Sequence, residues 1–98
     1  RVSRLDVYVN VRIRRLKDDG AGGRREEQTI AENIGKGGAR VLTSLDVAKG
    51  EVVEGVEVGG SFRAHAEVRN AYVGQDHIPR LNLCFIDAEA PARLVQSS

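Results

Sequence analysis

This chain has little of several residue types that mark particular classes of protein. Cys84 is the only cysteine among its 98 residues, which excludes an intramolecular disulfide and favours a reducing compartment. No apolar run approaches the roughly 18 residues of a membrane span, and no charged-then-apolar leader opens the sequence. We therefore expect a cytoplasmic protein that does not insert into a membrane.

Aromatic residues are scarce, and neither sign of charge is in clear excess. Two Tyr and two Phe offer few platforms on which nucleic-acid bases could stack. Fifteen Lys and Arg against 14 Asp and Glu give a net charge of +1, too little to draw the domain onto DNA. An anion must therefore be bound locally. Twelve of the cations are Arg, a bias that suits a nucleotide ligand and equally suits a GC-rich genome.

Length and patterning predict one small β domain over residues 1–98, and a start at Arg1 rather than Met suggests a fragment of a longer protein. Apolar and polar residues alternate, or nearly so, as they do in half-buried strands. The stretches concerned are residues 5–13, 24–34, 39–43, 51–58, 62–68 and 81–85. Gly55 interrupts the fourth stretch and predicts a bulge or bend. The tail, residues 87–96, suits a short helix with Pro91 in its first turn.

Five or six strands joined by turns predict an antiparallel sheet that closes into a small barrel. Gly59–Gly60 is a tight hairpin signal between two of the strands. The alanines and the Phe of residues 62–68 fit a narrow interior filled by side chains, with no cavity for a ligand. Function is therefore expected on the outer wall or at a rim.

The sequence offers no group activated for catalysis, so we do not expect an enzyme. A phosphate-binding P-loop would need Gly and Ser or Thr at positions that hold Ile30 and Gly37. His65, His77 and Cys84 lack the close spacing of metal ligands, so no metal site is expected. A lone cysteine in a strand is usually inert packing rather than a nucleophile.

Residues 33–41 are the most informative stretch, a polar turn between two predicted strands. Its polar and flexible residues are Asn33, Gly35, Lys36, Gly37, Gly38 and Arg40. The glycines allow positive φ and the close approach of another surface, and the two cations place charge beside them. This composition suits an anion cradle, and it equally suits an ordinary hairpin loop.

Five stretches, distributed along nearly the whole chain, carry a resemblance to a known family: residues 1–4, 33–41, 49–52, 62–68 and 80–87. In this order, with a long alternating strand after the first stretch, they resemble a PilZ domain. The resemblance implies a six-stranded antiparallel β-barrel with a short C-terminal helix, cytoplasmic and bacterial. It also implies a second-messenger receptor whose ligand is cyclic di-GMP and which needs no cofactor.

The PilZ ligand signature has two parts, Arg-x-x-x-Arg before the first strand and Asp/Asn-x-Ser-x-x-Gly in a later turn. Here Asn33 takes the Asp/Asn position, Gly38 takes the final Gly, and Gly35 stands where the signature has Ser. Arg1 matches the second arginine, which leaves the first upstream of the sequence given, and Arg4 is the alternative match. The implied cyclic di-GMP ligands are Arg1, Arg4, Asn33, Gly35, Gly38 and Arg40.

Two functions from different classes follow. The first is a non-enzymatic signalling module whose N-terminal segment orders around cyclic di-GMP and alters contacts with parent-protein domains or a partner protein. The second is a PilZ-like barrel that does not bind the nucleotide and serves as an interaction or structural domain, with exposed strand edges as its contact surface.

Overall fold

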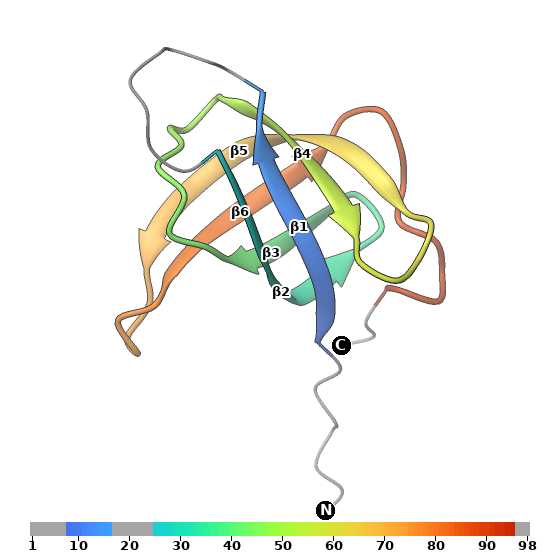
Figure 1. Cartoon of the computed structure of the whole chain (residues 1–98), viewed down its shortest axis with the longest axis horizontal. Helices are drawn as coiled ribbons and strands as arrows, with labels where there is room; N and C mark the ends of the chain where they lie inside the picture. The colour runs from blue at the N-terminus through green and yellow to red at the C-terminus, as the bar shows by residue number, and fades with distance from the viewer. Residues whose placement is uncertain (1–7, 17–24, 96–98) are drawn as a thin grey trace, which may run out of the picture.

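The computed structural model describes residues 8–16 and 25–95. This part of the chain contains six β-strands and no helix (Figure 1). The strands are β1 (Val9–Arg15), β2 (Glu26–Gly35), β3 (Gly38–Leu42), β4 (Val52–Glu57), β5 (Arg63–Val73) and β6 (Pro79–Phe85). Over the same residues, no helix has the length and apolar character needed to cross a bilayer. The expected all-β class is confirmed.

The six strands close into a barrel in the order β1-β2-β3-β6-β5-β4, and β4 pairs again with β1. All six neighbouring pairs are antiparallel. The expected antiparallel barrel is therefore confirmed. Each of the six strands has a neighbour on both sides along part of its length, so none is an edge strand throughout. Residues 70–73 of β5 pair with β6 alone. The expectation that exposed strand edges form a contact surface is therefore limited to strand segments of this kind, and it stays a prediction.

Two irregularities in register bend the barrel wall. In β2 the register shifts between Ala31 and Asn33, so that Glu32 is the extra residue opposite β3. In β5 it shifts between Val68 and Asn70, opposite β6. Because of the first shift, Glu32 and Asn33 both lie outside the core between the buried Ala31 and Ile34, at the part of the wall where the candidate site lies.

Gly55 does not produce the expected bulge. It pairs in continuous register with Ile13 on β1 and Ala64 on β5. A Cβ at Gly55 would lie 3.6 Å from Ile13 Cδ1, so the glycine leaves this space to the larger side chain. The expected hairpin at Gly59 is confirmed, with φ of 83° in the left-handed region that glycine favours.

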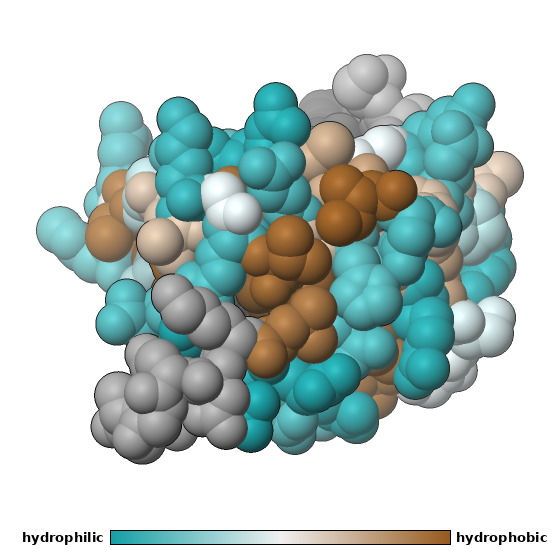
Figure 2. Space-filling model, turned by 90° about the horizontal axis from the view of Figure 1, so that it is seen from above, coloured by the Kyte–Doolittle hydropathy of each residue, from teal (hydrophilic) through white to brown (hydrophobic). Residues whose placement is uncertain are grey.

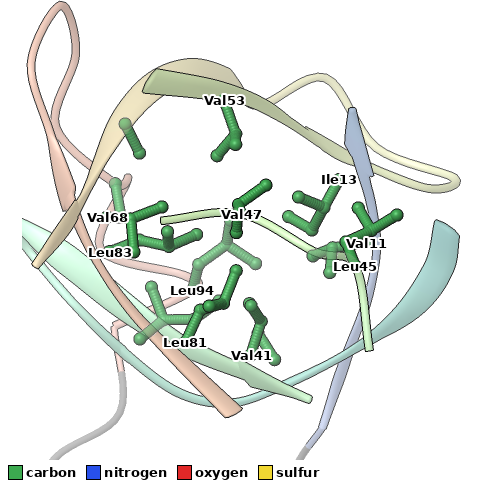
Figure 3. Close-up of a cluster of buried hydrophobic side chains, with 14 residues drawn as sticks. Val11, Ile13, Val41, Leu45, Val47, Val53, Val68, Leu81, Leu83 and Leu94 are labelled. Carbon is green, nitrogen blue, oxygen red and sulfur yellow. The ribbon is translucent and has the colours of Figure 1, made fainter. Parts of the chain in front are cut away.

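The core lies inside the barrel, where the inward side chains of the strands meet (Figure 3). The largest fully buried side chains are Ile13, Val41, Val53 and Val68. An apolar cavity of about 40 Å³ remains among the core residues. Small-molecule pockets usually exceed roughly 300 Å³, so the interior has no room for a nucleotide. The expected interior, filled by side chains, is confirmed.

Irregular segments close both ends of the barrel. The segment after β3 contributes Leu45 and Val47 to the core, and the segment after β6 contributes Ala90 and Leu94. Leu45, Val47 and Leu94 all lie among the strand side chains in Figure 3. Because β3 and β6 are antiparallel neighbours, the two segments leave the sheet at opposite ends.

The C-terminal helix expected over residues 87–96 is not present as far as residue 95, where the description of the tail ends. The segment instead makes a turn, in which the Leu94 N–H donates to Pro91 O at 2.9 Å. Tertiary contacts hold this shape: Leu94 is buried in the core, and the Arg93 guanidinium donates to both carboxylate oxygens of Glu57 at 2.7 and 2.9 Å.

The outer surface is mostly polar. Figure 2 shows hydrophilic side chains over most of the face seen from above, with a small group of hydrophobic side chains near its middle. Large hydrophobic residues are exposed at Tyr8, Leu16, Val73, Ile78, Ile86 and Val95. Val73 and Ile78 flank the β5–β6 turn, where the Gly74 N–H donates to Ile78 O at 3.0 Å.

Candidate functional site

The glycine-rich stretch is the hairpin turn between β2 and β3. Lys36 and Gly37 form its tip, and Gly35 pairs with Gly38 across it. None of the three glycines has φ in the left-handed region, so the expected positive φ is not adopted. The expected close approach is confirmed at Gly38, because a Cβ there would lie closer than 3.0 Å to the carbonyl oxygen of Leu83 on β6.

The tip of this turn is held from one side by the end of β6 and the segment that follows it. The Phe85 N–H donates to Gly37 O at 2.9 Å, and the Ala90 N–H donates to Lys36 O at 3.0 Å. The Lys36 side chain is left exposed, with Nζ 3.8 Å from Glu89 Oε1. An ion pair of this length between two solvated side chains is weak, so the Lys36 charge remains available to an anion.

Asn33 and Arg40 lie next to each other on the outer wall. They are cross-strand partners, and both are accessible: Asn33 is exposed and the Arg40 side chain is 41% exposed. Asn82 on β6 and Asn70 on β5 extend this row. With neighbouring strands about 4.8 Å apart, the four residues span roughly 14 Å. The row offers amide donors and acceptors beside a guanidinium fork.

Arg40 belongs to a charge network that reaches the β5–β6 hairpin. Its Nε lies 2.9 Å from Glu32 Oε1 without the alignment of a hydrogen bond. Arg80 donates to both oxygens of Glu32, and its Nη1 and Nη2 donate to the two Asp76 oxygens at 2.7 and 2.8 Å. Sequence reasoning missed this network because Glu32 and Arg80 are 48 residues apart and no local pattern connects them.

The network makes the fold sensitive to acid. Hydrogen bonding by Arg80 is the main cause that lowers the pKa of Glu32 below its ordinary value of 4.5. The same guanidinium lowers the pKa of Asp76 below its ordinary value of 3.8. A carboxyl group with a lowered pKa stabilises the folded state above its ordinary pKa, and this contribution is lost as the pH falls toward the lowered value.

We therefore expect the melting temperature to fall as the pH decreases from about 5 to about 2.5, and to fall less in Arg80→Gln. Arg69→Gln is the matched control, because within the described residues Arg69 makes a single long ion pair, 3.4 Å from Glu67. Thermal unfolding followed by circular dichroism measures the three curves. The same pH dependence in Arg80→Gln as in the unchanged chain would contradict the role given to this network.

Two of the expected ligand-binding residues, Arg1 and Arg4, lie outside the described residues. The described chain enters β1 at Val9, which pairs with Ala31, two residues before Asn33 on β2. Since β1 and β2 are antiparallel, β1 begins at the end of the wall where β2 finishes. The entry to β1 and the β2–β3 turn therefore share one end of the barrel.

The other side chains considered for chemistry do not gather into a site. His65 Nδ1 lies 2.6 Å from Asp87 Oδ2, and the His65 N–H donates to Asp87 Oδ1 at 2.8 Å. This contact with His65 lowers the pKa of Asp87 and ties β5 to the segment after β6. Cys84 is half-buried, and His77 lies in the β5–β6 turn. Residues 8–16 and 25–95 hold no cluster of three or more His, Cys, Asp or Glu placed to bind a metal.

Comparison with protein-family models, with curated proteins and with solved structures gave no match to this chain. The PilZ resemblance therefore depends on the motifs themselves. Function has to be argued from the groups that the barrel brings together: Asn33, Lys36 and Arg40 near the end where the chain enters β1.

Proposed function

We propose that this chain is a PilZ-like receptor module that binds cyclic di-GMP on the outer wall of its barrel. One observation carries the proposal: Asn33 and Arg40 are accessible cross-strand partners on the wall at the end where β1 begins, and the exposed Lys36 lies at the tip of the same hairpin. The arginines of the other half of the signature, Arg1 and Arg4, precede β1 in the chain. This order supports a two-part site, with the wall on one side of the ligand and the N-terminal arginines on the other.

The chemistry of the ligand fits these groups. A cyclic dinucleotide offers two phosphates and the edges of two guanines. Arginine pairs bidentately with phosphate or with guanine O6 and N7, and its flat guanidinium can stack on a base. Asn33 supplies a donor and an acceptor to a base edge, and Lys36 adds a point charge. In this proposal the module is cytoplasmic and bacterial, catalyses no reaction, and acts on domains of its parent protein or on a partner.

The serine missing from the signature gives a sharp test. Gly35 follows the buried Ile34 and shares the outward face with Asn33, and a Cβ there would meet only Gly38 O at 3.9 Å. Gly35→Ser therefore adds a hydroxyl without disturbing the fold. We expect several-fold tighter binding of cyclic di-GMP, about 1 kcal/mol for one hydrogen bond, measured by isothermal titration calorimetry.

Gly35→Ala is the control for this variant, because it adds the Cβ without the hydroxyl and should leave the affinity unchanged. A Gly35→Ser chain that binds no more tightly than Gly35→Ala would count against the site.

Removal of the Asn33 amide tests a second residue on the same face of β2. Asn33→Ala should weaken cyclic di-GMP binding about tenfold, since a base edge loses its donor and acceptor. Gln28→Ala is the matched control: Gln28 is another exposed amide of β2, five residues away and so roughly 17 Å along the strand. Equal weakening by the two variants in the same titration would show that the ligand does not bind at the Asn33 end.

A different observation supports the second function, an interaction or structural domain that does not bind the nucleotide. Arg40 already faces Glu32, and the tip of the turn already accepts hydrogen bonds from Phe85 and Ala90. The turn therefore has a structural use without any ligand. Absence of saturable heat with both the unchanged chain and Gly35→Ser would favour this function.

A further inference from the structure

Two arginines on the wall around β1 have no carboxylate partner. Arg12 on β1 and Arg63 on β5 are exposed, and the described part of the chain shows no hydrogen bond or ion pair for either side chain. Two residues further along β1, Arg14 binds Glu54 on β4, with Nη2 2.7 Å from Oε1. Arg63 also acts on Glu54 through space, but the carboxylate is held by Arg14. A positive charge therefore remains on this part of the wall.

The register places the two free arginines in one row. Arg12 lies opposite Val56 on β4, and Val56 lies opposite Arg63 on β5. With strands about 4.8 Å apart, the Cα atoms of the two arginines are separated by roughly 10 Å. The half-buried Val56 lies between them, so two cations flank one apolar side chain.

The residues around this row have the composition of a protein interface. The surface, which we call the β1 wall, consists of Tyr8, Asn10, Arg12, Gln28, Ile30, Val56 and Arg63. It contains no acidic residue and no lysine. Interface centres are enriched in Tyr and Arg and depleted in Asp, Glu and Lys. Tyr8, which is 51% exposed, adds an aromatic side chain at the end of the wall.

We propose that the β1 wall binds an acidic segment of a partner protein in which two carboxylates flank an apolar residue. Arg12 and Arg63 pair with the carboxylates, and Val56 contacts the apolar side chain. The positive charge is confined to one row, because Glu26 and Glu54 lie in the adjoining row, so a short acidic segment matches it better than an extended phosphate surface. The proposal does not depend on nucleotide binding, since the β1 wall excludes the β2–β3 turn.

A capped hexapeptide of alternating glutamate and valine serves as the probe, titrated into the isotope-labelled chain and followed by ¹H–¹⁵N NMR. We expect the shift changes to concentrate at Arg12, Val56 and Arg63. Arg12→Gln and Arg63→Gln should each weaken binding about threefold, as expected for exposed ion pairs, and the double reversal to Glu should abolish it. Arg69→Glu, on the same strand as Arg63 but outside the β1 wall, should bind like the unchanged chain.

Several results would overturn the proposal. These are shift changes centred on the β2–β3 turn, equal binding of a glutamine–valine peptide, or a double Glu variant that keeps its affinity. Inorganic phosphate and vesicles containing phosphatidylserine are titrated in parallel, and a preference for either over the glutamate peptide would also overturn it. The Gln variants keep the test valid if the double reversal fails to fold. Cyclic di-GMP titrated into Arg12→Gln separates this surface from the nucleotide site, because that affinity should not change.

Discussion

Gly38→Ala should lower the free energy of unfolding by about 3 kcal/mol. Gly38 is the first residue of β3, and a Cβ there would lie closer than 3.0 Å to the carbonyl oxygen of Leu83 on β6. That oxygen belongs to the backbone and cannot rotate away. The two strands must therefore separate, which weakens the pairing of Gly38 with Cys84 at the end of the barrel. Urea unfolding followed by circular dichroism measures the loss.

Gly35→Ala is the matched control in the same turn. A Cβ at Gly35 would meet only Gly38 O, at 3.9 Å, which is ordinary van der Waals contact. The free energy of unfolding should change by less than about 1 kcal/mol. Equal losses from the two substitutions would contradict the assignment of Gly38 to the close approach of β3 and β6.

Ile13→Ala should cost about 3 to 4 kcal/mol of unfolding free energy. Ile13 is only 2% exposed, and its Cδ1 occupies the space that Gly55 leaves open inside the barrel. Removal of three carbon atoms there enlarges a cavity that strands paired on both sides cannot close. Domains of this kind are stable by about 5 to 15 kcal/mol in total, so the variant loses a large share of its stability.

Ile13→Val provides the graded comparison, because it removes a single methylene and should cost about 1 kcal/mol in the same urea experiment. A similar cost for both variants would mean that the loss does not arise from the volume removed from the core.

The barrel could be predicted from sequence because each strand has one face in the core and one in solvent. In β1, Val11 and Ile13 alternate with exposed or half-exposed residues, and both are buried as expected. In β5, Ala66 and Val68 do the same. Turn residues at short intervals then indicate antiparallel hairpins, and five or six such strands are typical of a small closed barrel.

Features that depend on a distant partner could not be predicted. The register shift at Glu32 is set by how β2 pairs with β3, and Glu32 itself has nothing that marks a bulge. Gly55 predicts a bulge because an isolated glycine in a strand often marks one, but here the glycine leaves space for the Ile13 side chain. The tail forms no helix as far as residue 95, because the burial of Leu94 outweighs a weak local preference.

The candidate site could be predicted in part. The hairpin at residues 33–41 followed from its glycines, and a hairpin places Asn33 near Arg40 on the outer face. Arg40 lies beside Glu32, and Glu32 also binds Arg80 on β6. Only the folded barrel brings these three residues close together. The requirement for glycine at position 38 arises from its contact with β6, so the sequence of the turn alone does not indicate it.

Calorimetric titration of the chain with cyclic di-GMP tests the proposed function most directly. The proposed site requires saturable binding that Gly35→Ser tightens several-fold and that Asn33→Ala weakens about tenfold. Arg1→Ala should weaken it as well, since a phosphate would lose a bidentate partner. No saturable heat from the unchanged chain and from Gly35→Ser, at ligand concentrations up to about 1 mM, would contradict a cyclic di-GMP site at the β2–β3 turn.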